Sequence, residues 1–89
     1  MSSAEQPSGF QFPCTIPVKA MGRSGETFRS MVVEVIEQHV SVVPEQVRSR
    51  TSGSGNFQSV TVTVEMASRE QMEAIYADLA ECEEVLWTL

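Results

Sequence analysis

The fold is decided by the stretch VRSRTSGSGNFQSVTVTVEM, residues 47–66. Its second half alternates valine and methionine with serine, threonine and glutamate, which predicts a strand over 57–66 with one apolar face. Its first half has only one large apolar residue, so residues 46–51 are predicted to form a strand at the edge of a sheet. The Gly-Ser-Gly-Asn sequence at 53–56 predicts the hairpin turn that joins the two strands.

Amphipathic helical patterns flank this hairpin on both sides. Before the hairpin, apolar residues recur at spacings of three and four, which predicts a helix that Pro44 prevents from continuing. These residues are Phe28, Met31, Val32, Val35, Ile36 and Val40. After it, Ser68 to Gln71 has the form of a capping box at a helix start. The buried stripe of that second helix is Met72, Ile75, Tyr76 and Leu79.

Two further strands complete the pattern. Residues 12–22 put Ile16, Val18 and Ala20 on one face, and residues 85–89 alternate Val85, Trp87 and Leu89 with Leu86 and Thr88. The resulting order βαββαβ predicts an α+β, ferredoxin-like sandwich, with a four-stranded antiparallel sheet and both helices on one face. The strands at 12–22 and 57–66 should be central. Residues 10–89 are expected to form this single domain, and residues 1–9 a disordered leader.

Composition argues against several partners. Twelve acidic and six basic residues give a formal charge of -6, which repels nucleic acid and anionic membranes. No apolar run approaches the roughly 20 residues that span a bilayer, and residues 1–9 do not resemble a secretion signal. We therefore expect a cytoplasmic protein with no nucleic-acid or membrane partner.

Catalytic and metal-binding residues are not evident in the sequence. His39 is the only histidine, and Cys14 and Cys82 are predicted to lie at opposite ends of the sheet as reduced thiols, too far apart for a disulfide. The acidic residues at 78–84 lack the spacing of a calcium loop. We expect no enzyme activity, no catalytic residue, no metal and no cofactor.

The first candidate site is the sheet face that the helices leave open. Lys19, Phe57 and Leu86 are predicted to lie on it, and Arg48 and Arg50 to share one face of the edge strand. Together these residues are predicted to contact a protein partner or a second copy in a weak homodimer. An ordinary solvated sheet face is the alternative.

The second candidate is the turn between the first strand and the first helix. Amide groups at a helix start attract anions, and a charged side chain in the turn could hold a carboxylate of a small metabolite. The residues concerned are Met21, Gly22, Arg23, Ser24 and Gly25. A simple turn explains the same glycines.

The chain also resembles a known family. The segments at 12–13, 18–22, 32–36 and 52–60, in this order and spacing, resemble the YbeD-like family of small bacterial proteins over residues 10–89. Ser54 stands where the family pattern has a lysine, so no anion-binding role of that lysine is carried over. The resemblance implies a fold similar to ACT regulatory domains, which bind amino acids and related metabolites, a ligand contact near Gly22, a regulatory role and a connection to lipoate metabolism.

Overall fold

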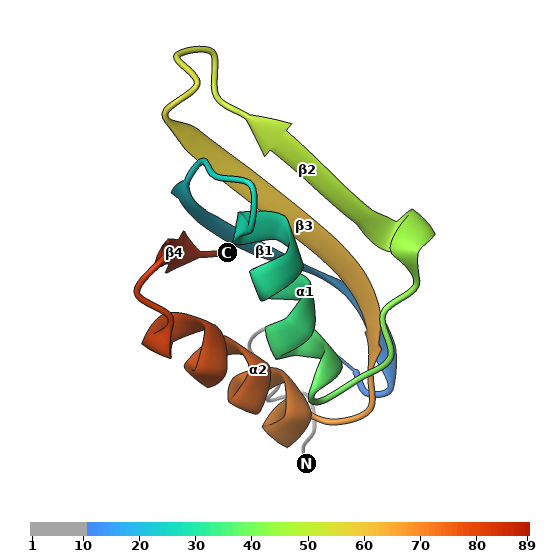
Figure 1. The fold of residues 1–89 in the computed structure, drawn as a ribbon. Coiled ribbons are helices and arrows are strands. Elements are labelled where there is room, and N and C mark those ends of the chain that lie inside the picture. The colour runs from blue at the N-terminus through green and yellow to red at the C-terminus, as the bar shows by residue number, and fades with distance from the viewer. Residues whose placement is uncertain (1–10) are drawn as a thin grey trace.

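The computed structural model describes residues 11–89, so the leader predicted for residues 1–9 lies outside the described part. Four strands, two α-helices and one short 3₁₀ helix follow one another along the chain (Figure 1). They are β1 (Cys14–Arg23), α1 (Phe28–Glu37), η2 (Pro44–Gln46), β2 (Val47–Thr51), β3 (Phe57–Met66), α2 (Arg69–Glu81) and β4 (Val85–Thr88).

The strands form one antiparallel sheet in the order β2-β3-β1-β4. Both helices lie on the same face of this sheet (Figure 1). The prediction of an α+β ferredoxin-like fold with central β1 and β3 is thereby confirmed. The opposite face carries no element of the described chain and is here called the open face.

The core lies between the sheet and the helices. Alternate residues of β1 and β3 point toward the helices, as the period of two requires, and α1 and α2 contribute residues at helical spacing. The buried apolar residues are Ile16, Val18, Ala20, Phe28, Val32, Ile36, Val60, Val62, Val64, Met66, Ile75 and Leu79. Each fully buried valine, isoleucine or leucine contributes about 1.5–3 kcal/mol, which is why the sequence pattern specifies this layer so strongly.

The predicted cap of α2 is present. The Ser68 hydroxyl accepts a hydrogen bond from the Gln71 backbone N–H at 3.1 Å. The Gln71 side chain accepts from the Ala67 N–H at 2.7 Å, one residue before the group that a standard capping box would use, and it donates to the His39 carbonyl at 2.9 Å. The start of α2 is therefore joined to the segment that follows α1.

Proline at position 17 fits the central strand because β4 is short. Lys19 exchanges two backbone hydrogen bonds with Leu89, at 2.9 and 3.4 Å, and the remaining β1–β4 pairs lie at residues 20–22 of β1. Pro17 lies beyond these pairs, where its missing N–H breaks no ladder bond to β4. At Pro17 the strand β1 is therefore paired with β3 alone.

Two polar residues far apart in sequence meet just beyond the end of α1. His39 lies just after α1, and its Nε2 is 2.6 Å from Oδ2 of Asp78 on α2.

The two cysteines are free, as predicted. Cys14 pairs with Met66 at one end of the sheet, whereas Cys82 precedes β4, which pairs with β1 at the other end.

Candidate interaction surface

The β1–α1 turn is held tightly by the structure around it. Gly22 is buried, and a Cβ atom on it would overlap the carbonyl oxygen of Glu84 and lie 2.6 Å from Cε1 of Phe28. Only glycine allows this close approach of backbone and ring. This residue, predicted from sequence as part of a ligand site, therefore has a packing role that requires no ligand.

The amides of the same turn donate to the β2–β3 hairpin. The Ser24 N–H donates to the Asn56 carbonyl at 3.0 Å, and the Ser24 hydroxyl donates to the Gly55 carbonyl at 2.5 Å. The Gly25 N–H donates to Oε1 of Gln58 at 3.2 Å. The backbone N–H groups of Ser24 and Gly25, which the sequence predicted to bind an anion, are thus already hydrogen-bonded within the protein.

Arg23 is the charged residue of the turn, and it borders a small hollow. The hollow has a volume of about 280 Å³ and is lined by Arg23, Glu83, Glu84 and Leu86. Glu83 and Glu84 line the same hollow, so their negative charges oppose the binding of an anionic ligand near Arg23.

The last strand corrects one sequence-based expectation. Met21 pairs with Trp87 but Gly22 pairs with Val85, so Leu86 is an extra residue in a β-bulge. Val85 therefore faces the helices while Trp87 shares the open face with Met21. The alternation in the sequence predicted that Val85 and Trp87 share the face toward the helices and that Leu86 lies on the open face. This prediction was wrong, because the bulge shifts the alternation of faces between Val85 and Trp87. Leu86 is exposed and lines the hollow beside Arg23.

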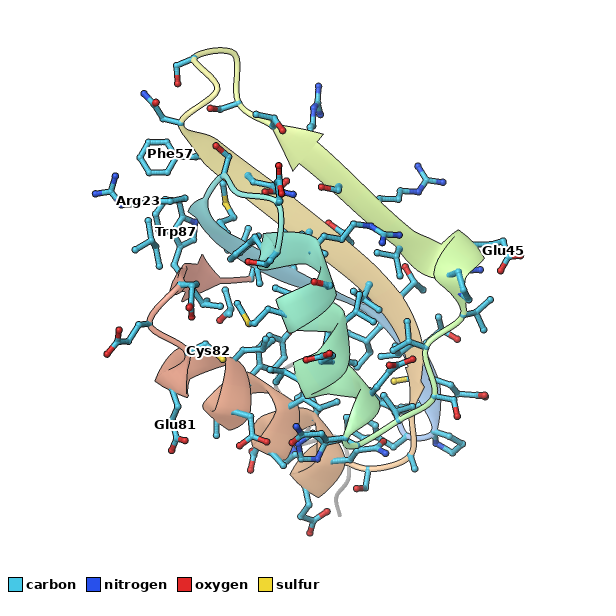
Figure 2. All side chains as sticks on the ribbon, in the orientation of Figure 1. Arg23, Glu45, Phe57, Glu81, Cys82 and Trp87 are labelled. Carbon is cyan, nitrogen blue, oxygen red and sulfur yellow. The ribbon has the colours of Figure 1, made fainter. Side chains whose placement is uncertain are left out.

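Aromatic residues consequently gather at one corner of the open face. The ring centroids of Phe57 and Trp87 are 6.5 Å apart and the rings are tilted by 45°. Both remain substantially exposed, Phe57 by 36% and Trp87 by 47%. Arg23 pairs with Phe57 in the β1–β3 register, and Figure 2 shows the three side chains at the same end of the sheet. Phe57 was predicted from the sequence as part of the partner surface, but its contact with Trp87 was not predicted.

Three basic residues lie beside this corner of the open face, in two rows of cross-strand pairs. In one row Thr61 of β3 pairs with Lys19 on one side and Arg48 on the other. In the next row Ser59 pairs with Met21 and Arg50 in the same way. Three of the residues predicted from sequence to form a partner surface are therefore brought together.

The face is hollowed where it meets the hairpin. A cavity of about 470 Å³ lies between Lys19, Met21, Arg50 and Phe57, with residues 51–53 of the hairpin at its rim. A second, overlapping hollow of about 310 Å³ extends along Lys19, Arg48 and Thr61. The two hollows offer hydroxyl, guanidinium and ammonium donors together with apolar surface.

Histidine, cysteine and carboxylate side chains are not clustered into a metal site within residues 11–89. This part of the chain contains no group of three or more histidine, cysteine or carboxylate residues placed to hold a metal ion. Cys82 donates to the Asp78 carbonyl at 3.5 Å. Burial raises the pKa of this thiol above its ordinary 9.0, and the carboxylates of Glu84, Asp78 and Glu81 raise it further, so the thiol is protonated at neutral pH.

No helix within the described residues has both the length and the apolar character needed to cross a membrane.

The structure thus defines a class of protein, a small ferredoxin-like domain with a basic and partly aromatic open sheet face. The chain belongs to the family described as "Protein of unknown function (DUF493)", whose model matches residues 7–89. This confirms the YbeD-like resemblance.

Curated relatives share most of the chain. It is 40% identical over 77 residues to a UPF0250 protein of Shewanella woodyi, covering 84% of each chain. It is 42% identical over 80 residues to a UPF0250 protein of Paraburkholderia phytofirmans, covering 89% of each. Among solved structures, protein HP0495 from H. pylori matches with a TM-score of 0.68 at 20% identity, covering 100% of this chain and 94% of that one. The last likeness concerns the fold alone.

Proposed function

We propose that this protein is a non-catalytic interaction module of the bacterial cytoplasm that docks on a partner protein through its open sheet face. The observation that carries the proposal is the shared location of Lys19, Arg48, Arg50 and the Phe57–Trp87 pair on the face opposite the helices. Exposed aromatic residues and arginines are the types enriched where proteins bind one another.

Regulation is the form of docking that the family resemblance implies. A non-catalytic module acts on another protein by binding it, and the resemblance points to an enzyme of lipoate metabolism as the one regulated. Weak or transient binding fits a surface that mixes cations, hydroxyls and a small apolar corner, because obligate interfaces are larger and more apolar.

The test is photocrosslinking in the native bacterium. A benzophenone amino acid is placed at Ser59 or Thr63 on the open face, or at Glu34 or Glu73 on the outside of the helices as matched controls. We expect adducts of discrete mass from the two sheet positions and none from the helix positions. Adducts from the helix positions alone, or no adduct from any of the four, would contradict the proposal.

The second candidate function is an ACT-like sensor of an amino acid or a related metabolite at the β1–α1 turn. The hollow between Arg23 and Leu86 favours it, whereas the engaged amides of Ser24 and Gly25 disfavour it. A thermal-shift screen of metabolites should be paired with Arg23→Gln, because a side chain at Gly22 would disturb packing. A stabilising metabolite whose effect is lost in Arg23→Gln would favour the sensor.

A further inference from the structure

Charge is unevenly distributed over this acidic chain. Four of its six basic residues, Lys19, Arg23, Arg48 and Arg50, lie on the open face, whereas the chain as a whole carries a formal charge of -6. Glu65 is the one carboxylate that the four strands contribute. It lies four residues along β3 from the row of Lys19, about 13 Å away. The open face is therefore a positive surface on a negative protein.

The spacing of these cations matches an extended polypeptide. Arg48 and Arg50 are two residues apart on β2, so they lie about 7 Å from each other, the distance between alternate side chains of a strand. Lys19 lies across β3 from Arg48, about 10 Å away at ordinary strand spacing. Alternate carboxylates of an extended segment can contact both arginines at once, and arginine binds carboxylates in a bidentate manner.

The aromatic corner adds an apolar contact at the end of the basic rows. Met21 lies in the row of Arg50 and pairs with Trp87, which contacts Phe57. A leucine or phenylalanine beside the carboxylates of a partner segment would cover these exposed rings. Such a combination of an aromatic anchor and flanking charges is what makes a short segment bind in one register.

Nucleic acid fits this face less well. Single-stranded bases stack on aromatic rings that lie flat on the central strands, but here the middle of the sheet carries Thr61 and Thr63. The two rings instead contact each other at a corner, on the first residue of β3 and on edge strand β4. The net negative charge of the chain also repels a polyanion at long range.

We infer that the open face binds an extended acidic segment of a partner protein, with carboxylates on Lys19, Arg48 and Arg50 and one apolar side chain on Phe57 and Trp87. This inference rests on the proposed function and adds the chemistry of the segment bound.

The probe is a blocked decapeptide, Glu-Glu-Asp-Glu-Leu-Phe-Glu-Asp-Glu-Glu, compared with its Gln/Asn counterpart. Trp87 is the single tryptophan of the chain, so its fluorescence reports on the aromatic corner directly. Amide NMR shifts give an independent map of the residues that bind. We expect the acidic peptide to shift resonances of β1, β2 and β3 on the open face, and binding to be lost at 1 M salt, where charges are screened.

Matched variants distinguish the effect of charge on the open face from the effect of the net charge of the chain. Arg48→Gln and Arg50→Gln should each raise the Kd of the acidic peptide by about two- to fivefold, the range of a solvent-exposed ion pair. Arg29→Gln removes the same charge from an exposed position on α1 and should leave the Kd unchanged.

The inference would be overturned by equal binding of the Gln/Asn peptide, by equal effects of Arg29→Gln and Arg50→Gln, or by tighter binding of a ten-nucleotide oligothymidylate. Absence of peptide binding would also overturn it. Crosslinks from Ser59 and Thr63 would show in that case that docking through the face holds and that only the partner chemistry is wrong.

Discussion

Gln58 joins three segments of the protein, and its replacement by alanine is the sharpest test of how the site is built. It is the one buried polar residue among residues 11–89, with 9% of its surface exposed. Its Oε1 accepts from the Gly25 N–H at 3.2 Å, and its Nε2 donates to the Ser49 hydroxyl at 2.8 Å. One side chain of β3 thereby ties the β1–α1 turn to β2.

The cost of Gln58→Ala follows from these contacts. Two hydrogen bonds contribute about 1 kcal/mol each, and the buried methylene that alanine lacks contributes about 0.8 kcal/mol. The free energy of unfolding should fall by about 3 kcal/mol. For a domain of this size that corresponds to a decrease in Tm of roughly 12–24 °C.

Urea denaturation followed by circular dichroism measures the change. Gln38→Ala is the matched control, because Gln38 is exposed after α1 and should change stability by no more than about 0.5 kcal/mol. If Gln58→Ala lowered the free energy of unfolding as little as Gln38→Ala does, the two hydrogen bonds of the Gln58 side chain would contribute nothing to stability. That result would refute the reasoning.

Three further predictions concern packing, thiol chemistry and association. Gly22→Ala should lower the free energy of unfolding in urea by about 1–3 kcal/mol or more, because the added Cβ overlaps neighbouring atoms. Gly25→Ala is the control and should leave this free energy unchanged, because its Cβ meets open space. Equal free energies of unfolding for the two variants would contradict the packing role of Gly22. In a Cys14→Ser background, alkylation of Cys82 should be slow at pH 7 and accelerate as the pH rises toward and above 9, because its raised pKa keeps the thiol protonated. Glu84→Gln removes a carboxylate that raises that pKa and should accelerate alkylation at pH 8; an unchanged rate would argue against the electrostatic effect. Sedimentation should show at most a weak homodimer. A dimer that persists at nanomolar concentration would contradict the proposal that the open face binds only weakly or transiently.

Local patterns in the sequence were sufficient for most of the fold. The alternation in β3, the helical spacing from Phe28 and the cap at Ser68 each depend on residues a few positions apart, and burial of the apolar face selects one arrangement. The shared face of Arg48 and Arg50 could be predicted for the same reason, since residues two apart on a strand point the same way.

Contacts between distant segments were decided by the tertiary structure alone. Trp87 reached the open face through a bulge that forms only when β4 pairs with β1, and Phe57 contacts it across the sheet. His39 and Asp78 meet although 39 positions separate them, and Gln58 finds Gly25 33 positions away. Side-chain periodicity is a property of one element, whereas strand register and bulges depend on two elements packing together, so no local pattern could place these contacts.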